Sequence, residues 1–246
     1  MKLKNNYFLF EAIGIPVQLN ISWFIILALI TYGLAFEYFP SRINGINPIL
    51  SVILGLITAL LLFGSLLLHE LSHAYVAEKN GLPVRSITLF IFGGVAALSK
   101  EPESPKVELQ MALAGPAMSF ALAFACWILY LIIINFIYIP WILAILAYIF
   151  YVNLVVGVFN LIPGFPLDGG RVLRALTWHY NRDYRKATFY ATAIGKGIAF
   201  LLMGLGAIQI FTGDWFSGLW LILIGYFLEE AAKTSYLEIN NSVQDN

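Results

Sequence analysis

The chain has 246 residues, of which 60% are hydrophobic and only 11% are charged. This balance excludes an ordinary soluble domain and indicates an integral membrane protein. The 14 basic and 14 acidic side chains cancel, so nothing in the charge suggests nucleic acid as a partner, and the single cysteine excludes an internal disulfide.

Taken in chain order, the sequence predicts six membrane-spanning segments. A run of about 20 apolar residues is long enough to cross the bilayer as a helix. After a lead-in over residues 1–17, extended near Gly14, spans are expected at 18–39, 48–79, 106–137, 141–178, 187–211 and 215–232. Asn80-Gly81 is a typical helix end, since glycine accepts the left-handed backbone there. We expect one transmembrane domain over residues 1–246.

A short β region is expected between the second and third spans. Residues 82–98 are too few, and too rich in β-branched residues and glycine, for a spanning helix. They predict strands with a break at Gly93-Gly94. The expected fold is therefore an all-α polytopic membrane protein of six transmembrane helices, with a small membrane-associated β region after helix 2.

The fourth span is expected to break at residues 160–170. Two prolines and three glycines lie between Asn160 and Arg171, and a regular helix cannot continue through them. The break frees backbone groups, which is tolerated at membrane depth only where protein or a wet cavity covers them. It also presents the carboxylate of Asp168.

The second span contains His69-Glu70-Leu71-Ser72-His73, an HExxH pattern. On a helix, His69 and His73 lie about 6 Å apart along the axis and on nearly the same face, so both imidazoles can reach one zinc ion. Glu70 is then placed to act on a water molecule at that metal. Ionisable groups inside a membrane are costly, which favours a functional site over two inert buried histidines.

A catalytic zinc takes three protein ligands and keeps one position open, so the pattern predicts one Zn²⁺ per chain and a third ligand elsewhere. Asp168 is the leading candidate, because the broken segment gives it a reason to turn inward. His179 and the adjacent Glu229 and Glu230 are the alternatives.

Positive charge predicts the orientation of the spans, because cytoplasmic loops collect Lys and Arg. With the N-terminus inside, twelve of the 14 basic residues fall on one side: Lys2, Lys4, Lys79, Arg85, Lys100, Lys106, Arg171, Arg174, Arg182, Arg185, Lys186 and Lys233. Both termini are therefore expected in the cytoplasm. His69 lies about ten residues before Lys79, which places the site some 15 Å into the bilayer from that side.

HELSH on the second span, together with Asn160-x-x-Pro163-x-x-Pro166-Leu167-Asp168-Gly169, resembles the site-2 protease family of intramembrane zinc metalloproteases, in its six-span prokaryotic type. The resemblance covers nearly the whole chain and includes the glycine-containing strand region after the HExxH helix, at Phe92-Gly93-Gly94. It implies zinc held by His69, His73 and Asp168. It also implies Glu70 as general base and acid, and Asn160 as a residue that holds the substrate or polarises its carbonyl.

One departure from the family pattern lies in the third span. Many relatives read Ala-Gly-Pro-x-x-Asn there, whereas this chain reads Ala114-Gly115-Pro116-Ala117-Met118-Ser119. We therefore assign no catalytic role to Ser119. Gly115-Pro116 is expected to shape helix packing.

The leading hypothesis is hydrolysis of peptide bonds within transmembrane segments of single-span membrane proteins, in a prokaryotic plasma membrane. The substrate helix must unwind first, and an edge strand at 82–98 could pair with the extended peptide, which makes Gly93 and Gly94 candidate substrate-binding residues. The alternatives are a multispanning zinc protease with a glutamate as third ligand and a non-catalytic metal-binding membrane protein. The resemblance also implies a cytoplasmic regulatory partner, the CBS pair that relatives often carry after the sixth span.

Overall fold

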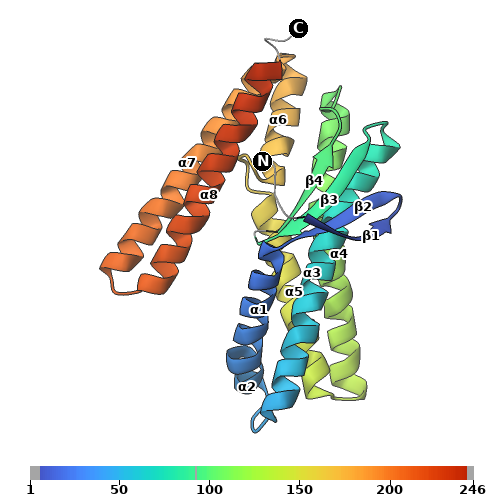
Figure 1. Cartoon of the computed structure of the whole chain (residues 1–246), viewed down its shortest axis with the longest axis vertical. Helices are drawn as coiled ribbons and strands as arrows, with labels where there is room; N and C mark the ends of the chain where they lie inside the picture. The colour runs from blue at the N-terminus through green and yellow to red at the C-terminus, as the bar shows by residue number, and fades with distance from the viewer. Residues whose placement is uncertain (1–5, 92, 243–246) are drawn as a thin grey trace. The chain divides into compact units, whose positions relative to one another are not determined.

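The computed structural model describes residues 6–91 and 93–242, with side chains described up to residue 234. Its elements are β1 (Asn6–Ala12), β2 (Ile15–Asn20), α1 (Ser22–Gly33), the π-helix η1 (Leu34–Tyr38), α2 (Phe39–Arg42), α3 (Pro48–Lys79), β3 (Val84–Phe90), β4 (Gly93–Leu98), α4 (Pro105–Phe136), α5 (Pro140–Asn160), α6 (Asp168–Asn181), α7 (Tyr184–Phe211) and α8 (Trp215–Ser242) (Figure 1). The expected fold class is confirmed, because the chain is mostly helical with a small sheet.

Six helical segments within the described residues are long and apolar enough to cross a membrane: Ser22–Arg42, Pro48–Lys79, Pro105–Phe136, Pro140–Asn160, Tyr184–Phe211 and Trp215–Thr234. They correspond to the six expected spans, with shifts of up to four residues at several ends, and the fourth span breaks where expected. Residues 18–20, expected in the first helix, belong to β2. The fourth span ends at Asn160, and the residues after the break form the separate helix α6.

The chain packs as two compact units. Unit 1 comprises residues up to 101 together with 114–158, and unit 2 comprises 102–113 together with the residues from 159 onward. Helix α4 contributes its first residues to unit 2 and the remainder to unit 1.

The sheet of unit 1 has four strands in the order β1-β2-β3-β4. Two of them, β1 and β2, precede the first helix: the extended backbone expected near Gly14 is observed, but its pairing into the sheet was not predicted. β1 and β2 form an antiparallel hairpin, and so do β3 and β4, while β2 runs parallel to β3 with Val17 opposite Ile87. A parallel pair needs a long crossover, and the helices α1 to α3 supply it. Among the described residues β4 pairs with β3 alone, so it forms an edge of the sheet.

Helix α3 is the central element of unit 1. The Asn47 side chain begins it by accepting hydrogen bonds from the amides of Ile49 and Leu50, at 2.9 and 3.4 Å. It ends at Lys79, where Gly81 takes a φ of +77°, so the expected helix end near Asn80-Gly81 is observed. The sheet packs along this helix (Figure 1). A buried cluster joins the two to α1 through Leu19, Trp23, Phe63 and Leu89.

In unit 2, α7 and α8 form an antiparallel helical hairpin (Figure 1). Glycines let the two backbones approach closely, since a Cβ on Gly206 would lie 2.6 Å from the carbonyl oxygen of Gly218. Small residues at such contacts are typical of membrane helices, because close packing drives their association. Helix α6 packs on α7.

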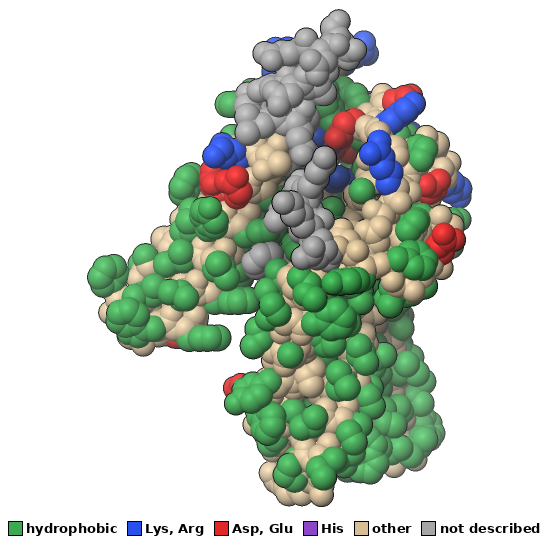
Figure 2. Space-filling model, viewed as in Figure 1, with side chains coloured by type: hydrophobic (Ala, Val, Ile, Leu, Met, Phe, Trp, Pro, Cys, Tyr) green, Lys and Arg blue, Asp and Glu red, His purple; other side chains and the backbone are tan. Residues whose placement is uncertain are grey.

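The surface of each unit fits a membrane environment. Figure 2 shows the exposed helical surfaces covered by hydrophobic side chains, with charged side chains gathered near one end of each unit. Exposed apolar residues include Phe24, Ile49, Phe124, Phe200 and Phe216. Because large contiguous apolar surfaces are rare on soluble monomers, this chain is an integral membrane protein.

Candidate metal centre

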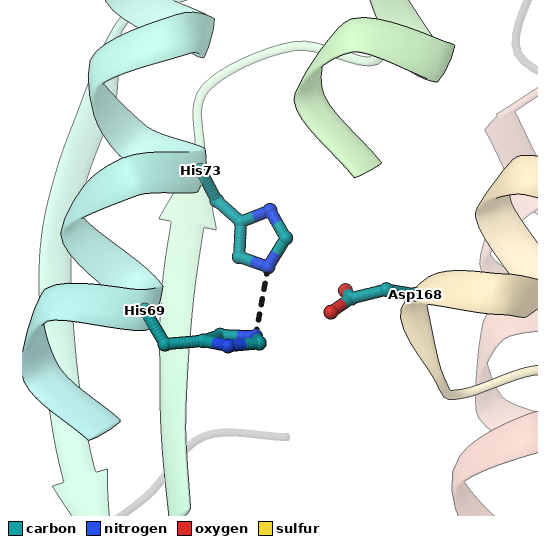
Figure 3. A group of neighbouring side chains, drawn as sticks. All are labelled: His69, His73 and Asp168. Atoms are coloured by element: carbon teal, nitrogen blue, oxygen red, sulfur yellow. Dashed lines mark hydrogen bonds between the residues drawn. The ribbon is translucent and has the colours of Figure 1, made fainter. Parts of the chain in front are cut away.

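His69 and His73 lie one turn apart on α3 and point the same way (Figure 3). Their Nε2 atoms are 3.2 Å apart, and the rings meet edge to face with centroids 4.9 Å apart. Both residues are buried, at 4% and 8% exposure. The four-residue spacing therefore places the two nitrogens as predicted, converging on one small region.

That region is kept open by Gly115 on α4. A Cβ built on Gly115 would stand 2.1 Å from Nε2 of His73 and 2.4 Å from Nε2 of His69. The two imidazoles therefore lie directly against the α4 backbone, and no side chain with a Cβ fits between α4 and the rings. Two buried imidazole nitrogens that converge to 3.2 Å are a donor pair that fits a metal ion.

The other ring nitrogen of His69 also faces α4. Nδ1 of His69 lies 2.8 Å from Oγ of Ser119, and Ser119 is 1% exposed. Gly115 and Ser119 are four residues apart on α4, as the two histidines are on α3, so one face of α4 meets both ends of the His69 ring.

Glu70 follows His69 on α3 and lies half-buried against β4. A Cβ on Gly94 would stand 2.4 Å from Cγ of Glu70, so only glycine allows the strand to pass this close to the side chain. Gly93 has a φ of +128°, which also favours glycine. Both glycines lie at the start of β4 and not between the strands, because β3 ends at Phe90 and β4 already begins at Gly93. Phe92 lies outside the described residues.

Asp168 belongs to unit 2, where it is the first residue of α6 and half-buried (Figure 3). A carboxylate is favourable at this position because the helix N-terminus carries partial positive charge. Asn160 is the last residue of α5 and is also half-buried. The seven residues between them are non-helical, and Phe165 donates its amide to the carbonyl of Ala191 on α7 at 3.1 Å.

The alternatives for the third zinc ligand lie on α6 and α8, in exposed or half-buried positions. His179 is exposed in the last turn of α6. Glu229 is half-buried near the end of the last span, and Glu230 is exposed with its carboxylate 3.9 Å from Nζ of Lys233. An exposed ion pair of this kind is typical of a solvated helix face.

Gly115 and Ser119 are the site residues that sequence reasoning missed. The signal was present as the Ala-Gly-Pro-x-x-Ser segment, whose glycine and serine repeat the four-residue spacing of the histidines. Their role depends on which face of α4 packs against α3, and spacing alone does not give that face.

Two converging buried histidines on an apolar helix of membrane-spanning length, with Glu70 next to His69 in the sequence, make a candidate metal centre. The sequence model of peptidase family M50 matches residues 57–140 and 138–204, which include this centre and the broken segment. The chain belongs to peptidase family M50.

Proteins similar to this chain are named as zinc metalloproteases or as a site-2 protease. A Synechocystis sp. protein assigned by name to the zinc metalloproteases is 41% identical over 238 residues, which are 95% of this chain and 60% of that protein. Rip3 of Mycobacterium tuberculosis, with a similar assignment, is 37% identical over 92% of this chain and 58% of its own length. This chain thus spans about 60% of these relatives. The solved structure of a site-2 protease from Methanocaldococcus jannaschii matches with a TM-score of 0.62 and 33% identity, covering 94% of this chain and 95% of that one.

Proposed function

We propose that this protein is an intramembrane zinc metalloprotease that hydrolyses peptide bonds within transmembrane segments of other membrane proteins. The observation that carries the proposal is the convergence of the buried Nε2 atoms of His69 and His73 beside Gly115. Membership of family M50 and the likeness to a solved site-2 protease support the same reaction.

The proposed zinc ligands are His69, His73 and Asp168, which together offer two imidazoles and one carboxylate. This donor set is one that catalytic zinc takes, with a fourth position for water or substrate. Zinc, when bound, supplies a Lewis acid that polarises the scissile carbonyl and lowers the pKa of the attacking water toward about 7.

Glu70 is the proposed general base and acid. It is adjacent to His69, and the close approach of Gly94 holds its side chain against β4. Its carboxylate takes the proton from the attacking water and later gives it to the leaving amine nitrogen. Asn160 is proposed to hold the substrate or to polarise its carbonyl through the side-chain amide.

The edge strand β4 is the proposed docking site for an unwound substrate. A transmembrane helix has its carbonyls hydrogen-bonded internally, so cleavage requires it to open, and the freed backbone groups then need new partners. β4 pairs on one side only among the described residues, and Glu70 lies against it. A peptide added to this edge would lie beside the proposed base, with Gly93 and Gly94 in contact with it.

The proposed substrates are single-span membrane proteins, and both termini of the chain are proposed to be cytoplasmic. If all six candidate helices cross the membrane, their even number puts both termini on the same side. The distribution of Lys and Arg favours the cytoplasmic side, and the resemblance to prokaryotic relatives favours a prokaryotic plasma membrane as the location. A cytoplasmic CBS pair is the proposed type of regulatory partner.

The direct test replaces Glu70 with glutamine. Glu70→Gln is expected to keep zinc and to abolish cleavage of a co-expressed transmembrane substrate, because the amide cannot accept the proton. Glu78→Gln is the matched control two turns further along α3, where Glu78 accepts a hydrogen bond from the amide of Val84 at 2.7 Å. Undiminished cleavage by Glu70→Gln would refute the assignment.

The third ligand is tested separately by zinc analysis. Asp168→Ala is expected to remove zinc, whereas Glu229→Ala and Glu230→Ala should retain it. The opposite pattern would identify the site as that of a zinc protease with a glutamate ligand. Zinc bound without cleavage across a broad panel of substrates would instead indicate a non-catalytic metal-binding protein.

A further inference from the structure

A hydroxyl group on α4 contacts the ring of His69 at Nδ1, the nitrogen that does not face His73. Oγ of Ser119 lies 2.8 Å from Nδ1 of His69, and both residues are buried. Two buried hydroxyls on α3 bond within their own helix instead. Thr58 and Ser65 on α3 each donate to the carbonyl four residues earlier in their own helix, at 2.7 and 3.0 Å. Ser119 reaches across to a neighbouring helix.

The two nitrogens of His69 must then have different roles. Nε2 faces the space beside Gly115, at 2.4 Å from the position of the missing Cβ, so it must present a lone pair there to act as a ligand. A neutral imidazole carries its proton on the other nitrogen, which is Nδ1. The Ser119 hydroxyl oxygen is positioned to accept that proton in a hydrogen bond. Partners of this kind orient ligating histidines and raise their basicity.

We propose that Ser119 is a positioning residue for the metal centre, which holds His69 in the Nδ1–H tautomer and fixes the orientation of its ring. α4 then supplies two functions from one face. Gly115 lets the two imidazoles lie against the helix, and Ser119, one turn further on, fixes the ring of His69. The proposal rests on the proposed zinc site, and it adds a residue to which the sequence pattern assigns no role.

The first test measures zinc affinity by competition with a chelator in the detergent-solubilised full chain. Ser119→Ala is expected to weaken zinc binding about 10–100-fold, the usual effect of losing such a partner. It should also change the visible absorption bands of the cobalt-substituted protein, because the His69 ring is no longer held. Ser119→Asn restores a hydrogen-bond acceptor and is expected to recover much of the affinity.

Ser51→Ala is the matched control, because Ser51 is also a buried serine whose hydroxyl bonds to another segment, at the carbonyl of Ala35. It lies at the other end of α3 and should leave zinc affinity unchanged. Equal affinity in wild type and Ser119→Ala would overturn the proposal, and so would an equal loss in Ser51→Ala. Wild-type protein that binds no zinc would overturn the proposed function itself.

A second measurement needs no variant at position 119. The chain has three histidines, so ¹⁵N-histidine spectra of the metal-free wild type can be assigned by replacing them one at a time. The Nδ1–H tautomer of His69 should predominate. Predominance of the Nε2–H tautomer would overturn the proposal even if Ser119→Ala fails to fold.

Discussion

Arg174 on α6 forms a buried ion pair with Glu108 at the start of α4, and both belong to unit 2. The two side chains are 4% and 0% exposed, and the arginine Nε donates to the same carboxylate oxygen. The guanidinium also lies over the rings of Phe165 and Tyr184, at 4.8 and 4.7 Å from their centroids. The Arg174 guanidinium therefore connects α6 to three other parts of unit 2: α4, the broken segment and the start of α7.

Removing one partner of this pair should be strongly destabilising. Glu108→Ala leaves the Arg174 charge buried without its carboxylate, and such a loss costs about 3–5 kcal/mol. The expected result is a large drop in the melting temperature of the detergent-solubilised protein. Glu230→Ala is the control, because it breaks an exposed pair with Lys233 and should cost about 0–1 kcal/mol. Similar melting temperatures for the two variants would contradict the role of the buried pair.

The broken segment before Asp168 packs directly against α7. A Cβ on Gly195 would stand 2.0 Å from the carbonyl oxygen of Phe165, so Gly195→Ala must displace the segment. We expect a destabilisation of about 1–3 kcal/mol from this overpacking. We also expect weaker zinc binding, since Asp168 follows the segment directly. Melting temperature and chelator competition measure the two effects.

Gly197→Ala is the control for that experiment. It lies two residues further along α7, and its Cβ would meet nothing within 4 Å. Because alanine favours the helix over glycine by about 1 kcal/mol, this variant should be neutral or slightly more stable. A zinc affinity unaffected by Gly195→Ala would show that the packing of this segment does not position a ligand.

The transmembrane helices were predictable from the sequence because each is a long apolar run, and both ends of α3 carry local signals at Asn47 and Gly81. The strands β1 and β2 were missed. Their place in the sheet depends on the parallel pairing of Val17 with Ile87, which lies 70 residues further along the chain. Such pairing is a property of the folded chain and leaves little trace in local sequence.

The features of the candidate metal centre also fall into those that local sequence predicts and those that depend on how the helices pack. His69, Glu70 and His73 were predictable because they lie within two turns of one helix, whose geometry alone brings the histidines together. The contributions of Gly115 and Ser119 depend on the face that α4 turns toward α3. Sequence therefore predicts the candidate histidine ligands more readily than it predicts the residues that pack against them and orient their rings.

Asp183 should give a pH-dependent contribution to stability. Its side chain begins α7 by accepting a hydrogen bond from the amide of Lys186 at 3.0 Å, and this bond, with the nearby Lys186 ammonium, holds the pKa of the carboxyl below its usual range. A lowered pKa in the folded state means that the stabilisation is present at neutral pH and is lost as pH falls through that lowered value. Melting temperatures measured across acidic pH test this.

Asp183→Asn removes the negative charge of this side chain but keeps an oxygen that can cap the helix. The amide oxygen of asparagine can still accept the bond from Lys186, so helix α7 should still be capped. The difference in melting temperature between wild type and this variant should be constant near neutral pH and shrink in acid. A difference that grows as the pH falls would contradict the assignment.

Gly115→Ala tests whether the space beside the two histidines is the metal position. The added methyl group would lie 2.1 Å from Nε2 of His73 and 2.4 Å from Nε2 of His69, so the rings must move out of their converging positions and zinc content should fall to background. Gly64→Ala is the control, because its Cβ on α3 would meet nothing within 4 Å. Both variants should elute as a single species in detergent, so that zinc loss is not a consequence of unfolding. A full complement of zinc in Gly115→Ala would place the metal elsewhere in the protein.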